Sequence, residues 1–131
     1  MPIDGLGVVS RAAGEPALVE DIVIDDPGPG EVLVRVQASG VCHTDLHYKL
    51  GNITDEFPFL LGHEAAGLVE AVGEGVTNVA AGDFVIIAWR APCSNCRACL
   101  RGRPWYCFDS MNAAQQMTLA DGSPLLSLIH I

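Results

Sequence analysis

Positive charge is scarce in this sequence. It holds 7 Lys and Arg residues against 16 Asp and Glu residues, which gives a formal net charge of -9 at pH 7. Nucleic acids and anionic membranes repel such an acidic chain, so we expect neither as a partner. Long apolar runs are missing too, and no stretch is long enough to cross a bilayer as a helix. The composition is that of a globular chain.

A signal peptide and a complete dinucleotide-binding fingerprint are also missing. The first residues lack the basic and apolar regions of a secretory signal, so we expect a cytoplasmic, reducing location. Gly28-Pro29-Gly30 and Gly73-Glu74-Gly75 contain G-x-G, but neither continues as G-x-x-G into a helix. We interpret both as turns. A Rossmann domain is therefore absent from this chain, and residues outside it would have to supply any NAD site.

Glycine and proline, by contrast, are plentiful, with 14 and 8 residues in a chain that is 50% hydrophobic. Val32, Val34 and Val36 alternate with other residues at the period of two that is typical of a strand with one buried face. Short apolar runs separated by Gly and Pro indicate a mainly β (α+β) fold, a small barrel or sandwich. The strands that we expect are Leu6–Arg11, Ala17–Ile24, Glu31–Ala38, Ala65–Val72 and Phe84–Trp89.

Four of the five cysteines are spaced C-x2-C-x2-C-x7-C, at Cys93, Cys96, Cys99 and Cys107. Two intervening residues let the backbone turn so that two sulfurs face one point, and the longer interval lets the chain return with the fourth. This pattern predicts a closed, tetrahedral structural zinc site. The alternatives are disulfides or scattered buried thiols. Four arginines lie in or beside the segment: Arg90, Arg97, Arg101 and Arg103. They could offset the negative charge of a zinc tetrathiolate, or they could simply be solvated.

A second candidate site involves Cys42, His63 and Glu64, each at a predicted strand–loop junction. A catalytic zinc needs three protein ligands and one open position. Cys42 and His63 would give two ligands, and Asp45 could hold the other ring nitrogen of His63. Thr44 and His47 add a hydroxyl and an imidazole suited to a proton relay. Spacing alone leaves open that these are a core cysteine and a surface histidine.

The order of these motifs resembles the zinc-dependent medium-chain alcohol dehydrogenases over about residues 6–125. The runs that carry the resemblance are Gly40–His47, Gly62-His63-Glu64 and the four-cysteine pattern. The resemblance implies a GroES-like catalytic domain over residues 1–125, a distorted β-barrel with a zinc lobe at about 90–110. The implied roles are catalytic-zinc ligands for Cys42 and His63 with Glu64 close to the metal, an orienting carboxylate for Asp45, a proton relay for Thr44 and His47, contact with the cofactor pyrophosphate for His43, and structural-zinc ligands for Cys93, Cys96, Cys99 and Cys107.

Within that family, several runs resemble the mycothiol-dependent formaldehyde dehydrogenases. They are Pro58–Gly67, Gly82–Ile86, Cys96–Cys99, Arg101–Pro104, Tyr106–Asp109, Asn112-Ala113 and Met117–Leu119. This implies NAD-linked oxidation of S-(hydroxymethyl)mycothiol by an intact enzyme that is a homo-oligomer. A general primary-alcohol or glutathione-dependent formaldehyde dehydrogenase is the alternative within the family. A non-catalytic zinc-ribbon module is the alternative outside it, but such a module has no use for the motifs around Cys42 and His63.

The sequence also departs from the family pattern. Family members are longer, with a Rossmann domain and a third catalytic-zinc cysteine, so we expect an N-terminal fragment that is inactive alone. Residues 126–131 do not continue the pattern, and a transposase end sequence used in sequencing libraries encodes the same six residues. We expect this tail not to be native and do not count His130 as a ligand. The structural zinc should survive truncation, Glu64 could replace the missing ligand, and exposed apolar surface should promote aggregation.

Overall fold

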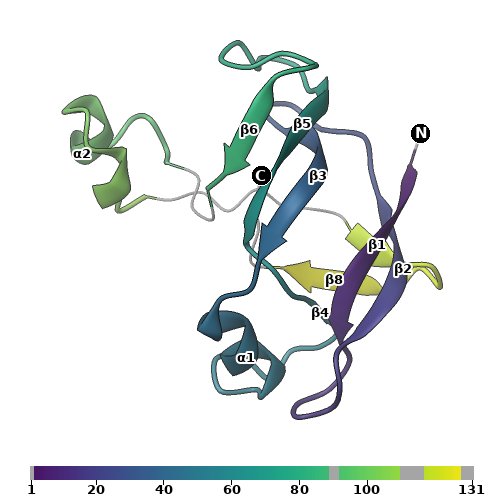
Figure 1. Ribbon diagram of the computed structural model, residues 1–131. Coiled ribbons are helices and arrows are strands. Elements are labelled where there is room, and N and C mark those ends of the chain that lie inside the picture. The colour runs from purple at the N-terminus through teal and green to yellow at the C-terminus, as the bar shows by residue number, and fades with distance from the viewer. Residues whose placement is uncertain (1, 89–91, 110–116, 128–131) are drawn as a thin grey trace.

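The fold is mainly β, as the sequence predicts, and consists of a closed barrel and a three-stranded sheet (Figure 1). The computed structural model describes residues 2–88, 92–109 and 117–127. The barrel order is β1-β2-β7-β8-β4, and the second sheet has the order β3-β5-β6. The strands are β1 (Ile3–Ser10), β2 (Leu18–Ile24), β3 (Val32–Gly40), β4 (Phe59–Leu60), β5 (Glu64–Val72), β6 (Phe84–Ile87), β7 (Met117–Leu119) and β8 (Pro124–Ser127), and the helices are α1 (His43–Lys49), α2 (Arg97–Leu100) and the 3-10 turn η1 (Pro104–Tyr106).

The barrel is held by a small apolar core. Val9, Ile22, Leu119 and Leu125 are each no more than 5% exposed and come from four different barrel strands. Burying one such side chain contributes roughly 1.5–3 kcal/mol, so this cluster ties β7 and β8 to the amino-terminal hairpin. The barrel closes where the two-residue strand β4 pairs in parallel with β8.

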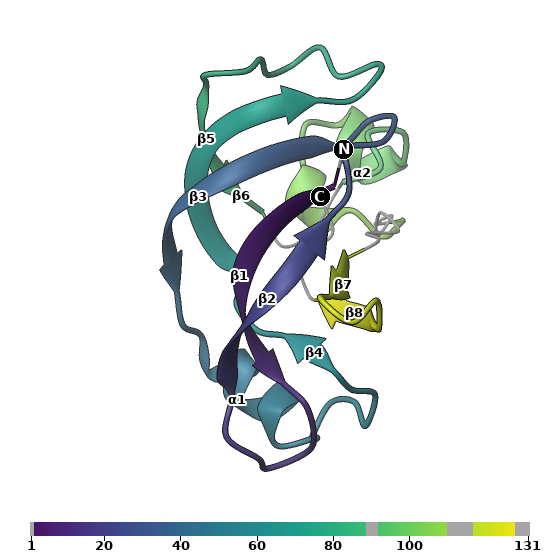
Figure 2. The ribbon, with the colours of Figure 1, turned by 90° about the vertical axis from the view of Figure 1, so that its right-hand side faces the viewer.

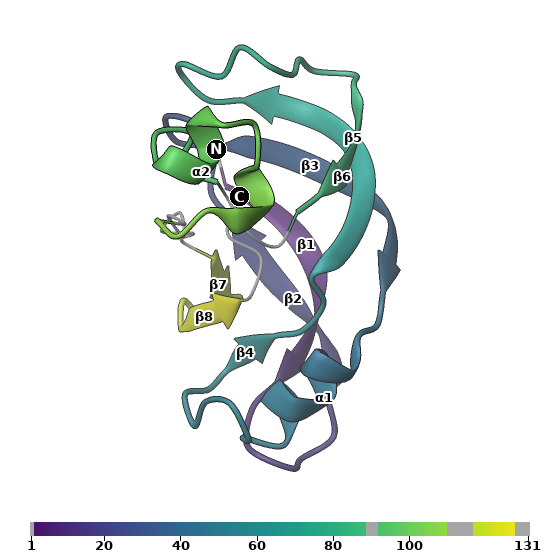
Figure 3. The same cartoon turned by 90° about the vertical axis from the view of Figure 1, so that its left-hand side faces the viewer.

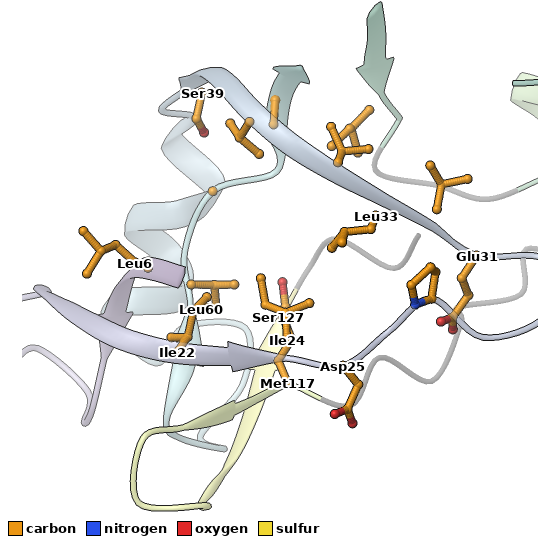
Figure 4. A pocket seen from close by; sticks show the side chains of 18 of the residues that line it. Leu6, Ile22, Ile24, Asp25, Glu31, Leu33, Ser39, Leu60, Met117 and Ser127 are labelled. Atoms are coloured by element: carbon orange, nitrogen blue, oxygen red, sulfur yellow. The ribbon is translucent and has the colours of Figure 1, made fainter. Parts of the chain in front are cut away.

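The second sheet lies beside the β1–β2 hairpin, as Figure 2 shows. A cavity of about 610 Å³ separates the two sheets, with Leu6 and Ile22 from the hairpin on one side and Leu33 of β3 on the other (Figure 4). Val32, Val34 and Val36 line this cavity, but so does Leu33. The predicted alternation along β3 is broken because its pairing with β5 shifts register between Leu33 and Val34.

The two G-x-G segments are turns, as predicted, and they pack against each other. The amide of Glu31 donates to the carbonyl of Gly28 at 3.0 Å, which closes the first turn. Between the turns, the amide of Gly30 donates to Glu74 and that of Gly73 donates to Glu31, both at 2.8 Å. A Cβ atom on Gly73 would overlap the carbonyl oxygen of Gly28, so glycine at position 73 allows the two turns to meet at one end of the second sheet.

Several predicted boundaries differ from the observed ones. Helix α1 was not predicted from the sequence, and β6 ends at Ile87 rather than Trp89, which lies outside the described residues together with Arg90 and Asn112-Ala113. Leu126 and Ser127 belong to β8, so only residues 128–131 of the tail, His130 included, lie outside the described part. Among the described residues, no helix has the length and apolar character needed to cross a membrane.

Candidate metal centres

The four lobe cysteines form one sulfur cluster. The Sγ atoms of Cys93, Cys96, Cys99 and Cys107 lie within 4.8 Å of one another. Those of Cys96 and Cys99 are 3.6 Å apart, beyond the length of an S–S bond. All five cysteines of the chain are in the described residues, and none forms a disulfide. Figure 3 shows the lobe around α2 as a separate unit in front of the second sheet. The disulfide alternative therefore does not describe this structure.

Local backbone geometry brings the lobe sulfurs together. Cys96 is the residue before the first turn of α2, and Cys99 lies three residues later on the same helical face. Cys107 directly follows the 3-10 turn η1. The amide of Cys96 donates to the sulfur of Cys93 at 3.2 Å, and the amide of Cys93 donates to the sulfur of Cys107 at 3.4 Å. The lobe therefore carries its own amide donors for negatively charged sulfur.

The thiols of the lobe differ in pKa, which is lowered for Cys96 and Cys107 and raised for Cys99. The backbone amide of Cys99 lowers the pKa of Cys96 to about 6. Burial, followed by the contact with Cys96, raises the pKa of Cys99 to about 12. The amide of Cys93 is the largest cause of the lowered pKa of Cys107. Four adjacent thiolates repel one another unless a cation lies between them, and four sulfurs are the donor set of a closed zinc site. The lobe thus fits Zn²⁺.

Three of the four arginines in or beside the lobe belong to the described residues, and all three are solvent-exposed. Arg97, Arg101 and Arg103 all have exposed side chains. Their exposure agrees with the solvated alternative, and charge compensation of a zinc tetrathiolate stays a prediction.

Cys42, His63 and Glu64 form the second cluster. One ligand atom from each lies within 4.8 Å of the other two. Strand pairing explains this proximity, because Gly40 at the end of β3 is paired with Glu64 at the start of β5. A Cβ atom on Gly40 would lie 2.5 Å from a carboxylate oxygen of Glu64. Glycine at position 40 therefore leaves the space in which the Glu64 side chain lies.

Asp45 joins the two chain segments that carry this cluster. It is 4% exposed. One carboxylate oxygen accepts from the amide of Cys42 at 3.1 Å, and the other accepts from the amide of Gly62 at 2.9 Å. The second oxygen also lies 3.2 Å from Nδ1 of His63. With Nδ1 donating to Asp45, the lone pair of His63 Nε2 is free for a metal. This is the contact that the predicted orienting role requires.

In the second cluster, the pKa of Cys42 is lowered and the pKa of His63 is raised. Thr44, whose hydroxyl lies 3.5 Å from the sulfur of Cys42, is the main cause of the lowered pKa of that thiol. Burial is the largest influence on His63 and disfavours its charged form, but contacts with Cys42 and Asp45 outweigh it and raise the pKa of His63. A thiolate, an imidazole nitrogen and a carboxylate are all zinc ligands, so this donor set also fits zinc.

His43 and His47 lie outside both clusters. They are exposed and sit on α1, four residues apart, with ring centroids 4.9 Å apart. The structure adds Asn52, whose amide nitrogen lies 3.3 Å from Nδ1 of His47. Our sequence interpretation missed Asn52 because it did not predict helix α1. The available signal was Gly51, because glycine commonly follows the last residues of a helix.

Comparison with known proteins agrees with this geometry. The sequence model of the alcohol dehydrogenase GroES-like domain matches residues 28–124. The chain belongs to that family. An alcohol dehydrogenase zinc-binding domain protein from Burkholderia ambifaria superposes with a TM-score of 0.89 at 38% identity, covering 99% of this chain and 37% of that one. The family-level resemblance and the GroES-like fold are therefore confirmed.

Curated relatives of this GroES-like domain are alcohol dehydrogenases. An alcohol dehydrogenase from a Moraxella species is 46% identical over 103 residues, 76% of this chain and 30% of the relative. An S-(hydroxymethyl)glutathione dehydrogenase from Candida maltosa is 42% identical over 108 residues, 81% of this chain and 28% of the relative. The chain thus spans between a quarter and a third of the curated relatives that it matches. The matched range 28–124 includes every residue of both metal clusters.

Proposed function

We propose that this chain is the metal-binding part of a zinc-dependent, NAD-linked alcohol dehydrogenase. The observation that carries the proposal is the Cys42–His63–Glu64 cluster with Asp45 holding Nδ1 of His63. A structural lobe alone would not need a second donor set whose histidine is oriented in this way. The activity belongs to the protein at the length of its relatives, with NAD held mainly by residues that this chain does not contain.

The chain's own residues divide into three tasks. Cys42 and His63 would hold the catalytic zinc with Glu64 beside it, and the lobe cysteines would hold a structural zinc. A bound catalytic zinc supplies Lewis acidity that lowers the pKa of a substrate hydroxyl. Thr44, whose hydroxyl contacts the sulfur of Cys42, would accept the hydroxyl proton and give its own proton to His47, which releases a proton to solvent, while His43 would contact the cofactor pyrophosphate.

As substrate we propose the thiol adduct of formaldehyde, S-(hydroxymethyl)mycothiol. Support comes from the sequence runs that resemble the mycothiol-dependent branch and from the S-(hydroxymethyl)glutathione dehydrogenases among the relatives. The test is an assay of the full reading frame with formaldehyde and NAD, with mycothiol, with glutathione and with neither. NADH formation that requires mycothiol supports the proposal. Activity only with glutathione, or only with simple alcohols, assigns the enzyme to one of the alternative substrates.

Zinc content tests the catalytic site separately from the substrate. We expect wild type to bind two zinc ions, the second more weakly, because a site with fewer protein ligands binds less tightly. A Cys42→Ser, His63→Ala double variant should lose only the weaker ion, and the matched Cys96→Ser, Cys99→Ser variant only the tighter one. Equal zinc content in wild type and the first variant would favour a non-catalytic zinc-ribbon module.

A further inference from the structure

The end of helix α1 places Asn52 beside His47. The amide of Gly51 donates to the carbonyl of Tyr48 at 3.0 Å, and the amide of Asn52 donates to the carbonyl of His47 at 2.9 Å. Gly51 has a φ of 74°, in the left-handed region. This pair of bonds is the Schellman ending of a helix, which brings the second residue after the C-cap, here Asn52 after Leu50, against the residue five positions earlier. That contact is usually apolar, but here it joins an amide to an imidazole.

The Asn52 side chain is hydrogen-bonded to one particular nitrogen of His47. Its Nδ2 atom lies 3.3 Å from Nδ1 of the ring. An amide NH₂ group can only donate, so Nδ1 must accept, and the proton of the neutral ring is then on Nε2. The His43 ring packs on the same histidine at 4.9 Å between centroids. Two neighbours therefore define the orientation of an otherwise exposed ring.

We propose that Asn52 is a positioning residue that controls whether His47 can accept a proton. With Nδ2 donating to Nδ1, the neutral ring has no lone pair at Nε2 and cannot accept there. If the Asn52 amide rotates, its oxygen accepts from a proton on Nδ1 and the Nε2 lone pair becomes free. Nε2 then takes up the hydroxyl proton, and the resulting imidazolium releases it to water, which restores the neutral ring. That His47 passes a proton from substrate to solvent rests on the proposed function, whereas the hydrogen bond between Asn52 and His47 does not.

Asn52→Asp should fix the other tautomer of His47, with the proton on Nδ1. The new carboxylate can only accept, so it requires a proton on Nδ1 and leaves Nε2 as the acceptor. The backbone amide of residue 52 still ends the helix in this variant, so α1 should keep its fold. Asn78→Asp is the matched control, because it adds the same charge in the exposed β5–β6 loop, which Figure 1 shows at the opposite end of the molecule from α1.

The test is the position of the ring proton, read by long-range ¹H–¹⁵N NMR of the chain at about pH 8, above the ordinary pKa of histidine. His47→Gln assigns the signals. We expect the proton on Nε2 in wild type and in Asn78→Asp, and on Nδ1 in Asn52→Asp. A wild-type proton on Nδ1, or the same tautomer in wild type and Asn52→Asp, would overturn the proposal. The measurement needs no enzymatic activity, so it can fail or succeed independently of the alcohol dehydrogenase assignment.

Discussion

The sulfur lobe and the Cys42 cluster hold their donor atoms in different ways. In the lobe, all four sulfurs come from the short segment Cys93–Cys107, and its own backbone amides donate to them. In the other cluster, Cys42 and His63 lie on opposite sides of α1 and β4 in the sequence, and a buried carboxylate, Asp45, joins them. The lobe should therefore gain or lose its metal largely by itself, whereas the second cluster should depend on the fold around it.

Among the variants that test this difference between the two clusters, Cys107→Ser should have the largest effect. Cys107 is the buried member of the lobe, and binding of a structural zinc is worth about 10–16 kcal/mol at neutral pH. We expect the variant to lose the lobe zinc and its lobe amides to exchange with solvent without protection. Amides around the barrel core at Val9 and Leu119 should stay protected. Hydrogen exchange followed by mass spectrometry measures both regions in one experiment.

Cys42→Ser is the reciprocal variant. It should lose the other zinc and leave exchange in the lobe unchanged. If the barrel amides lose protection as fully as the lobe amides in Cys107→Ser, the two regions form one cooperative unit and the contrast is wrong.

Asp45→Ala should have the next largest effect. Removing this carboxylate leaves the amides of Cys42 and Gly62 and the ring of His63 without their acceptor in a buried place. We expect a loss of roughly 2–4 kcal/mol in the free energy of unfolding, read from urea denaturation. Asp83→Ala is the control, because the exposed Asp83 accepts one amide, from Ala80, and its loss should cost only about 0.5–1.5 kcal/mol. Equal losses in the two variants would contradict the bridging role of Asp45.

Features that depend on residues close together in the sequence could be predicted from it, whereas features that depend on distant residues or very short elements could not. The lobe could be predicted from spacing because its sulfurs are neighbours along the chain. The turns at Gly28–Gly30 and Gly73–Gly75 could be predicted because Gly and Pro act on the residues beside them. The closing strand β4 could not, because its two residues are too few to form a pattern. Helix α1 was missed for a similar reason, since seven residues give less than two full turns of periodicity.

The raised pKa of His63 predicts opposite pH effects with and without zinc. In the metal-free chain, a raised pKa stabilises the fold below about pH 6.5, and this contribution is lost as the pH rises through the folded-state pKa. Zinc needs the neutral ring, so bound zinc reverses the sign and its contribution falls as the pH falls. The contribution of His63 to the urea midpoint should therefore be larger at about pH 6 than at about pH 8 without zinc. With bound zinc, it should be smaller at about pH 6 than at about pH 8. Subtracting the midpoints of His63→Gln from those of wild type isolates the contribution of His63. If this contribution changes with pH in the same direction with and without zinc, the expectation is wrong.

Gly40→Ala should give the smallest effect, confined to the second cluster. The new Cβ would lie 2.5 Å from a Glu64 carboxylate oxygen, so that side chain must move. If Glu64 contributes to zinc binding, the affinity of the weaker site should fall by about tenfold, roughly 1.4 kcal/mol, while that of the lobe stays unchanged. A competition titration with a zinc chelator measures both sites.

Gly5→Ala is the matched control for this prediction. It adds the same methyl group in a strand, where the nearest heavy atoms would be 3.5 Å away. It should change neither affinity. Unchanged weak-site affinity in Gly40→Ala would mean that Glu64 lies near the metal without binding it, because the substitution moves the carboxylate but leaves Cys42 and His63 in place. The cluster would then have only two ligands from this chain, and its weak affinity would come from them alone.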